Sequence, residues 1–220
     1  MIVTIDGPAG SGKSTAAREL ARRLGVAYLD TGATYRAATL KALREGVDLS
    51  DDSALAAAVR DADIRLSPEP DGVRVWLDGR EVTREIRSEE VSQASSALAR
   101  SPQVREVLVE LQRRIGREVG EFVAEGRDQG SVVFPEADVK FYVTASAEVR
   151  ARRRQQELAE AGEDARYEDV LSAIRRRDAG DRGRQVAPLV KPEGAVEIDT
   201  SSNTIEQTQA QLLAHLEGVR

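Results

Sequence analysis

Residues 7–15 read Gly-Pro-Ala-Gly-Ser-Gly-Lys-Ser-Thr and match the pattern G-x-x-x-x-G-K-[ST] of a phosphate-binding loop at every fixed position. The short apolar run before the loop, residues 2–5, is typical of a buried strand, and small or apolar residues after it recur at helical spacing. A strand, a glycine-rich loop and a helix in this order direct backbone N–H groups and the helix N-terminus toward one anion. We therefore expect an α/β fold that binds phosphate; a glycine-rich turn that matches by chance is the alternative.

Each part of this loop has a physical role in holding a nucleotide. Glycines let the backbone curl around phosphate without Cβ clashes. The ammonium group of Lys13 can reach the outer phosphates, and the hydroxyl of Ser14 can ligate Mg²⁺, which makes Ser14 the predicted metal ligand. The residues predicted to hold the nucleotide phosphates are Gly7, Pro8, Ala9, Gly10, Ser11, Gly12, Lys13, Ser14 and Thr15.

Composition limits the class of protein. The 220 residues suffice for one domain with an insertion or for two small domains, and 40% hydrophobic and 32% charged residues are ordinary for a soluble chain. The longest apolar runs are too short to span a membrane, and the first expected strand leaves no room for a signal peptide. Because the chain has no cysteine for disulfides or thiolate metal sites, we expect a cytoplasmic protein.

The charged residues argue against one large class of partner. The net charge of −6 is unfavourable for a general binder of nucleic-acid polymers. Of the 32 basic residues, four are Lys and 28 are Arg, and Arg binds phosphate and carboxylate with two parallel hydrogen bonds. Codon bias explains most of this excess, so the position of each Arg has to decide whether it serves a site.

Strand and helix patterns alternate along most of the chain. Further buried strands are expected at residues 26–29, 122–124, 139–143 and 195–198. Helices are expected at residues 33–45, from Ser101-Pro102 onward, at residues 147–161 and 167–177, and from Thr204 to near Gly218. This alternation predicts a three-layer P-loop α/β fold with a five-stranded parallel sheet that is covered on both faces.

Residues 64–82 depart from this alternation of strands and helices, because their pattern is that of antiparallel hairpins. Apolar residues alternate on either side of turn signals at residues 68–72 and at Asp78-Gly79, and Trp76 falls on the opposite face of the middle strand. A helix over residues 88–99 is expected next. We expect a small three-stranded antiparallel sheet inserted into the core, and a simple surface decoration is the alternative.

Polar clusters at the ends of predicted elements are candidate sites for a second substrate. Open α/β sheets bind ligands at the carboxyl ends of their strands, and residues 30–36 and 125–130 both follow predicted strands. The first cluster offers Thr31 and Arg36, although its leading residues are also expected to cap a helix. The second cluster offers Arg127 between two glycines, next to an aspartate.

A run of arginines and aspartates at residues 175–184 is a weaker candidate. Like charges on adjacent helical turns repel unless an anion or carboxylates balance them. The aspartates within the run can supply that balance, so a solvated helix end is an equal alternative. Ser96 and Arg105 flank the helix start at Ser101-Pro102, and His215, the single histidine, is expected at the surface.

Taken together, these segments resemble one family. They are Asp6-Gly7-Pro8 before the phosphate loop, Asp30-Thr31-Gly32-Ala33 with Tyr35-Arg36, Glu125-Gly126-Arg127-Asp128, and Arg177-Asp178 through Arg184 into Val186-Ala187-Pro188-Leu189. In this order, and over essentially the whole chain, they resemble the bacterial cytidylate kinases. The phosphate loop alone would be generic, whereas the four segments together are specific.

The resemblance implies an activity and a domain plan. The activity is Mg²⁺-dependent transfer of the γ-phosphoryl group of ATP to CMP or dCMP. The plan is a single nucleoside monophosphate kinase domain with a core at residues 1–60 and 100–220, a CMP-binding insertion at about 61–100 and a short helical lid at about 153–167. We expect a monomer whose partners are small nucleotides, with no nucleic-acid polymer and no membrane. Departures are small: Thr31 stands where the family often has Ser, and Gln129 where it usually has Met.

The resemblance also implies roles for single residues. The nine loop residues would hold the ATP phosphates, Arg36 and Arg127 the acceptor phosphate, and Asp181 a ribose hydroxyl. Gly162 would serve as a lid hinge, with an ordinary helix-ending turn as the alternative. The implied catalytic residues are Lys13, Arg36, Arg127 and the lid arginines Arg153 or Arg154. The implied CMP-binding residues are Thr31, Arg36, Ser96, Arg105, Arg127, Asp128, Arg177, Asp181 and Arg184.

Other functions retain part of this pattern. A kinase for UMP, another nucleoside monophosphate, shikimate or gluconate would keep the loop and the arginines. A nucleotide-dependent switch such as a small GTPase would need a guanine-reading Asn-Lys-x-Asp element, which the sequence lacks, and would leave the arginines for a second anion unexplained. An ATP-binding module without enzymatic activity fits the intact Lys13 and Ser14 less well.

Overall fold

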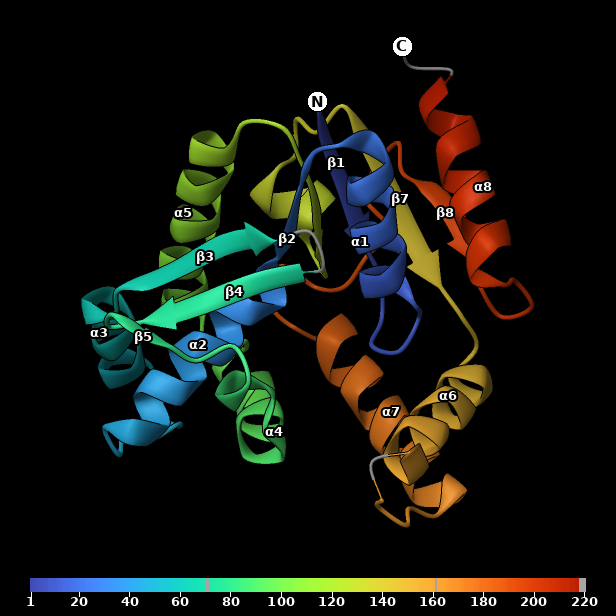
Figure 1. The fold of residues 1–220 in the computed structure, drawn as a ribbon. Coiled ribbons are helices and arrows are strands. Elements are labelled where there is room, and N and C mark those ends of the chain that lie inside the picture. The colour runs from blue at the N-terminus through green and yellow to red at the C-terminus, as the bar shows by residue number, and fades with distance from the viewer. Residues whose placement is uncertain (70–71, 161, 218–220) are drawn as a thin grey trace.

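Five parallel strands form the central sheet of the computed structural model, which describes residues 1–69, 72–160 and 162–217 (Figure 1). The order across the sheet is β2-β6-β1-β7-β8, and all four neighbouring pairs are parallel. This confirms the predicted sheet, with strand ends shifted by one or two residues. The strands are β1 (Ile2–Asp6), β2 (Ala27–Asp30), β6 (Phe122–Gly126), β7 (Val139–Thr144) and β8 (Val196–Asp199).

The register of the sheet brings the ends of its central strands together. Asp6, the last residue of β1, lies opposite Gly126 of β6 and Tyr142 of β7. Asp30 ends β2 opposite Glu125. Because parallel strands end at one common edge, the loops after β1, β2 and β6 open side by side, where ligands bind in sheets of this kind.

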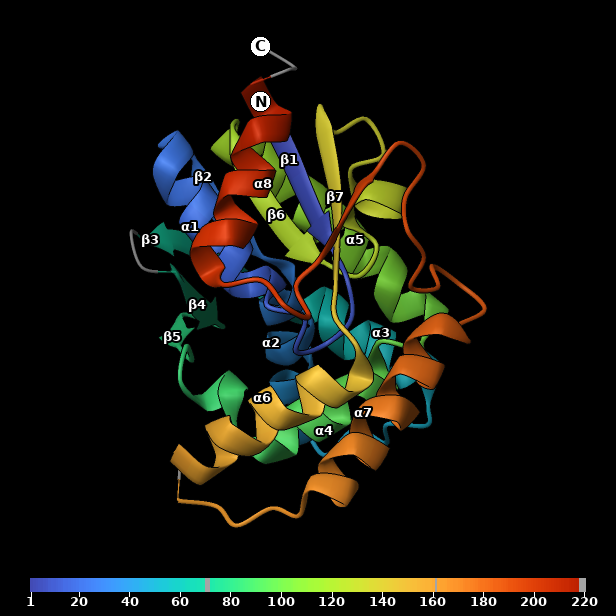
Figure 2. The same cartoon turned by 90° about the vertical axis from the view of Figure 1, so that its right-hand side faces the viewer.

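Helices cover both faces of the sheet, as Figure 2 shows. On one face α1 (Lys13–Leu24) packs against α8 (Ile205–Glu217), and α5 (Pro102–Val119) lies on the other. The backbone of α5 approaches β6 closely, because a Cβ added at Gly116 would lie 3.0 Å from the ring of Phe122. Ser101 caps α5 as expected, by accepting a hydrogen bond from the backbone N–H of Val104. Among the described residues, no helix is long and apolar enough to cross a membrane.

The inserted hairpins form a separate three-stranded antiparallel sheet. Its strands are β3 (Ile64–Glu69), β4 (Gly72–Leu77) and β5 (Arg80–Glu81). Alternate residues of β4 are buried while Trp76 faces the other side, as predicted. The turn expected over residues 68–72 falls partly on residues 70 and 71, outside the described residues. Pro68 and Glu69 themselves continue β3. A short 3₁₀ helix, η1 (Glu85–Arg87), leads to α4 (Glu89–Leu98), which Ser88 caps.

Two further helices lie beyond the carboxyl ends of the strands. They are α6 (Ala147–Glu160) and α7 (Tyr167–Arg182), packed against each other. Gly162 follows α6 with a φ of +83° and donates its backbone N–H to Ala159, which is how a helix ends. Its function as a hinge stays a prediction. The sequence pattern ended the second helix at Arg177, five residues too early, because buried ion pairs of Asp178 and Asp181 extend it.

Three further elements differ from the sequence expectation or were not expected at all. The helix α2 (Thr31–Arg44) begins two residues early because Asp30 accepts a hydrogen bond from the backbone N–H of Ala33. The helix α3 (Asp52–Asp61) was missed; its N-cap is Asp51 and it buries four small or apolar residues. A π-helical turn, η2 (Gln129–Val133), follows β6. The predicted end of the last helix near Gly218 lies outside the described residues.

Candidate active site

The phosphate loop has the backbone geometry that its glycines predict. Gly10 and Gly12 adopt φ angles of +76° and +81°, which side chains with a Cβ disfavour. Gly7 is required for space, because an added Cβ would lie 2.0 Å from the carbonyl oxygen of Val143. Within the described chain, no side chain caps the start of α1 at Lys13. The N–H groups of its first turn therefore point toward the space where a phosphate would sit.

Lys13, the first residue of α1, is buried against the phosphate loop. Its Nζ donates a 3.3 Å hydrogen bond to the carbonyl oxygen of Pro8 and lies 3.7 Å from Oε2 of Glu125. Burial lowers the pKa of Lys13 to about 8, and the positive charge of Arg127 lowers it further, whereas Glu125 opposes the change. An ammonium group that is already partly desolvated gains strongly from a new anion in its vicinity.

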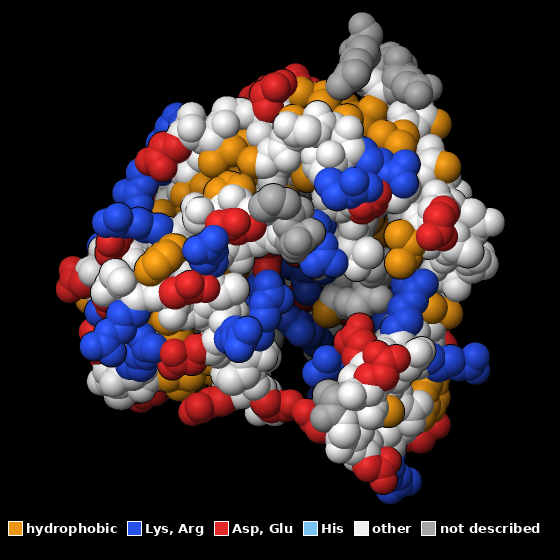
Figure 3. Space-filling model, viewed as in Figure 1, with side chains coloured by type: hydrophobic (Ala, Val, Ile, Leu, Met, Phe, Trp, Pro, Cys, Tyr) orange, Lys and Arg blue, Asp and Glu red, His pale blue; other side chains and the backbone are white. Residues whose placement is uncertain are grey.

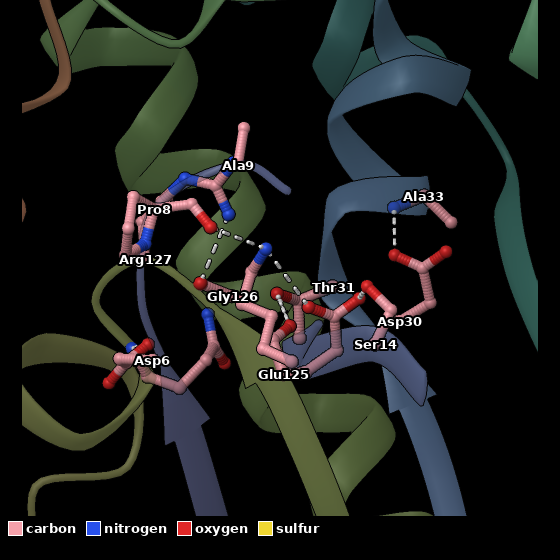
Figure 4. Close-up of polar contacts among 12 residues, drawn as sticks. Asp6, Pro8, Ala9, Ser14, Asp30, Thr31, Ala33, Glu125, Gly126 and Arg127 are labelled. Atoms are coloured by element: carbon pink, nitrogen blue, oxygen red, sulfur yellow. Dashed lines mark hydrogen bonds and ion pairs between the residues drawn. The ribbon is translucent and has the colours of Figure 1, made fainter. Parts of the chain in front are cut away.

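Glu125 is the centre of a polar network at the end of β6 (Figure 4). Its Oε1 accepts hydrogen bonds from the hydroxyls of Ser14 at 2.8 Å and Tyr28 at 3.2 Å. Its backbone carbonyl accepts from Thr31 at 2.7 Å. The hydroxyl of Ser14 and the carboxylate beside it are hard oxygen donors, the type that Mg²⁺ prefers. The arrangement thus fits a magnesium ion next to the phosphate loop.

A cleft of about 1490 Å³ opens beside the phosphate loop. Its walls come from the loop, α4, α6, α7 and the segment after β8. Figure 3 shows Lys and Arg side chains gathered around the hollow between the two lower lobes of the molecule. Twelve of the predicted site residues line it: Ala9, Gly10, Gly12, Lys13, Ser14, Thr15, Ser96, Arg153, Arg154, Arg177, Asp181 and Arg184.

Arginines from two segments meet at Asp181 on the wall of this cleft. Arg127 donates from Nε to one carboxylate oxygen of Asp181 at 3.0 Å, and Arg184 donates to the other. Arg177 lies nearby, and burial together with the positive charge of Arg127 lowers its pKa. Arg127 and Arg184 are therefore joined through one carboxylate, and Arg177 and Arg184 line the same cleft.

The remaining predicted residues do not line the cleft. Arg105 and Asp128 form a buried ion pair, and the guanidinium of Arg105 lies 5.9 Å from the ring centroid of Tyr35. Arg36 donates to Asp30 at 2.7 Å. The predicted residues outside the cleft lining are Gly7, Pro8, Ser11, Thr31, Arg36, Arg105, Arg127 and Asp128.

The two expected lid arginines have different partners. Arg153 donates to the hydroxyl of Thr200 at 3.1 Å and to its backbone carbonyl at 2.6 Å, which ties α6 to the segment after β8. Arg154 donates to Glu157, one turn later on the same helix, at 3.2 Å. Both line the cleft, but Arg154 is the more exposed and, among the described residues, its ion-pair partner is a neighbour on its own helix.

Asp6 links the phosphate loop to the loop after β6. Its two carboxylate oxygens accept the backbone N–H groups of Gln129 and Gly130, each at 2.8 Å. Burial raises the pKa of Asp6 to about 7 against the effect of these two hydrogen bonds. Asp6 thereby fixes the position of Asp128 relative to Gly7, although the two are far apart in sequence.

Sequence reasoning missed several residues of the site. Arg87 and Arg100 line the cleft, and nothing in their sequence context marks that placement. Arg176 also lines it and belongs to the candidate run at residues 175–184, although no role was predicted for it. Glu125 opens the candidate cluster at residues 125–130, but no role was predicted for it, although it stands one residue before the end of the strand that is hydrogen-bonded to β1 and follows three apolar residues. Thr200 follows β8 directly and likewise stands at a strand end.

Comparison with known proteins places the chain among named relatives. A family model described as cytidylate kinase matches residues 3–217. A cytidylate kinase of Caldanaerobacter subterraneus subsp. tengcongensis is 50% identical over 93% of this chain and 89% of that protein. One from Rhodococcus opacus is 50% identical over 97% and 93%, and one from Mycobacterium avium is 47% identical over 98% and 93%.

Solved structures support the fold. An uncharacterized protein from Eubacterium ventriosum superposes with a TM-score of 0.54 over 99% of this chain and 98% of that chain. Its sequence is 10% identical, so this likeness concerns the arrangement of strands and helices alone.

Proposed function

The chain belongs to the cytidylate kinase family, and on that premise we propose that it transfers the γ-phosphoryl group of ATP to CMP or dCMP, yielding ADP and CDP or dCDP. The observation that carries this proposal is that Arg127 and Arg184 both pair with Asp181, which lines the same cleft as Arg177 and Lys13. A P-loop accounts for one polyanion. The additional arginines account for a second one, the acceptor phosphate.

The proposal divides the cleft between two nucleotides. ATP lies along residues Gly7 to Thr15, with the lid arginines Arg153 and Arg154 against its phosphates. The acceptor phosphate meets Arg36 and Arg127, while Arg177 and Asp181 hold the sugar. The cytosine is read by Ser96, Arg105, Asp128 and Arg184. Thr31, which already donates to Glu125, would line the acceptor side.

Phosphoryl transfer asks the protein mainly for positioning and charge stabilisation. The acceptor phosphate of CMP is already an anion, so no side chain has to remove a proton from it. Lys13 neutralises the outer phosphates of ATP, and the arginines hold the acceptor in line with them. Ser14, with Glu125 behind it, would hold Mg²⁺, whose positive charge would offset the negative charge of the donor phosphates.

The same proposal assigns parts of the fold to steps of the cycle. The insertion at about residues 61–100 carries acceptor binding, and the lid at about residues 153–167 closes over ATP and excludes water. We propose that the protein acts as a monomer on free nucleotides in the cytoplasm.

An acceptor panel tests the assignment. Purified protein is given ATP, Mg²⁺ and one acceptor at a time, and ADP formation is followed by a coupled assay. CMP and dCMP should support turnover well above UMP, AMP and shikimate. Omitting Mg²⁺ should abolish it. Higher kcat/KM for another acceptor would reassign the substrate, and nucleotide binding without transfer to any acceptor would overturn the enzymatic assignment.

A further inference from the structure

Arg150 is a buried cation on α6 that none of the roles above uses. Its side chain is 3% exposed. Its Nε donates to the carbonyl oxygen of Ala145 at 2.9 Å, and its Nη1 donates to the carbonyl oxygen of Ala9 at 3.2 Å. Both oxygens of Asp178 accept from the same guanidinium, at 3.0 and 2.6 Å. One side chain thus contacts the end of β7, the phosphate loop and α7.

The partners of Arg150 belong to opposite halves of the cleft. Ala9 is part of the loop proposed to hold ATP. Asp178 comes directly after Arg177 and less than one turn before Asp181. Arg177 and Asp181 are both on the side of the cleft that is proposed to bind the acceptor. A single guanidinium therefore joins the phosphate loop to the end of α7 that is proposed to bind the acceptor nucleotide.

The link between them is stiff. A guanidinium presents its donors in a planar fork, which fits both oxygens of a carboxylate at once. The loop also packs against the same residue, because a Cβ added at Gly10 would lie 3.4 Å from Cβ of Arg150. Neither charge of the pair can turn toward water, since Asp178 is buried as well.

From this geometry we infer that Arg150 is a positioning residue that couples the two nucleotide sites. Ordering of the phosphate loop around the donor phosphates fixes Ala9, and Arg150 transmits that order to Asp178 and its neighbours on α7. By linkage, acceptor binding must order the phosphate loop by the same factor. The inference rests on the proposed function, because it needs two nucleotides to bind in one cleft.

The chain supplies a matched control for this role. Glu148 and Arg175 form an ion pair between the same two helices, with an N–O distance of 2.8 Å, but both side chains are more than half exposed. The structure shows no contact of either with the described part of the phosphate loop. Removal of this pair tests whether any link between α6 and α7 suffices.

The experiment measures binding of each nucleotide alone and in the presence of the other. Isothermal titration calorimetry uses the full chain, CMP and a non-hydrolysable β,γ-imido analogue of ATP with Mg²⁺. The coupling factor is the ratio of the Kd for CMP without and with the saturating analogue. The variants are R150M/D178N, which leaves no unpaired buried charge, and the control R175M/E148Q.

The expected wild-type coupling factor is about fivefold or more. R150M/D178N should bind each nucleotide alone within about threefold of wild type, yet its coupling factor should fall toward one; R175M/E148Q should retain the wild-type factor. If the double variant does not fold, D178N alone should lower the factor in the same direction. Any of three results would overturn the inference: a wild-type coupling factor near one, an unchanged factor in the variants of Arg150 and Asp178, or an equal loss of coupling in the control R175M/E148Q. Lack of CMP binding by the wild type would overturn the proposed function itself, which distinguishes the two failures.

Discussion

The hydroxyl of Ser14 donates a 2.8 Å hydrogen bond to the carboxylate of Glu125, 111 positions further along the chain. The same carboxylate lies 3.7 Å from Nζ of Lys13. The start of α1 and the end of β6 are thus joined through one acidic side chain, next to the loop that is proposed to hold ATP. The charge of Lys13 depends on Glu125, and several measurable properties follow from this dependence.

The pH profile should report the unusual pKa of Lys13. The residue has to be positively charged to neutralise phosphate, and its pKa of about 8 lies well below the ordinary value. We expect kcat/KM for ATP to fall as the pH rises through about 8, since this parameter reports groups of the free enzyme. Glu125→Gln removes the charge that opposes the decrease in the pKa of Lys13, so the fall should move to lower pH. A profile that is identical in the two proteins would contradict the coupling.

Removal of the ammonium group should have a large kinetic effect. Lys13→Ala should lower kcat/KM by a factor that corresponds to ~3 kcal/mol or more of transition-state stabilisation, by analogy with the loss of other preorganised charge donors. Steady-state kinetics with saturating CMP measures it, and circular dichroism checks that the loop variant still folds. Wild-type turnover would exclude Lys13 from the reaction.

Base selectivity should depend on the buried pair of Asp128 and Arg105. A site built for hydrogen bonds rejects analogues that lack them much more strongly than an apolar pocket does. Asp128→Ala should relax the preference for CMP over UMP, but it also leaves the buried charge of Arg105 unpaired, at a cost of about 3–5 kcal/mol. Asp128→Asn keeps the shape of the side chain and is the cleaner variant.

For Asp128→Asn we expect the ratio of kcat/KM for CMP to that for UMP to fall by about tenfold or more. Thermal unfolding of the same sample separates loss of selectivity from loss of fold. An unchanged ratio in a folded variant would remove Asp128 from the role of reading the base.

Stability should depend on pH through Asp6. Its pKa of about 7 in the folded protein lies above the ordinary value of 3.8. Between these values the folded protein holds a proton that the unfolded chain releases, so the contribution of Asp6 to stability is greatest at low pH and declines as the pH rises toward 7. Asp6→Asn removes this titration.

Urea unfolding of wild type and Asp6→Asn at about pH 5 and about pH 8 measures the effect. The free energy of unfolding of the wild type relative to the variant should fall by ~3 kcal/mol between the two conditions. A difference that is independent of pH, or one that grows, would show that the two backbone N–H groups outweigh burial.

Local patterns predicted most of the sheet and the phosphate loop. The apolar run before Gly7, the alternation on either side of Asp78-Gly79 and the Ser101 cap each depend on residues close in sequence, and each appears in the structure. The helix at Asp52–Asp61 was missed because alanines make a weak apolar pattern, although Asp51 is an ordinary N-cap signal.

Long-range contacts account for what the sequence could not predict. The helix α7 continues past Arg177 because Asp178 meets Arg150 and Asp181 meets Arg127, partners 28 and 54 positions away. The raised pKa of Asp6 likewise depends on its burial in the fold, which outweighs the lowering effect of its hydrogen bonds from residues 129 and 130. The charge of a residue does not predict these ion pairs, because other arginines and aspartates of the same segments are exposed to solvent.

Three of the guanidiniums proposed to meet the acceptor already pair with an aspartate: Arg36 with Asp30, Arg105 with Asp128, and Arg127 with Asp181, which also pairs with Arg184. An incoming nucleotide would therefore have to replace aspartates in preformed ion pairs rather than bind arginines that have no counter-charge. Such a surface offers little net attraction to a long polyanion, whose binding depends on releasing many counterions. It favours instead the binding of a single small molecule whose hydrogen-bonding groups match the orientation in which the aspartates hold those arginines.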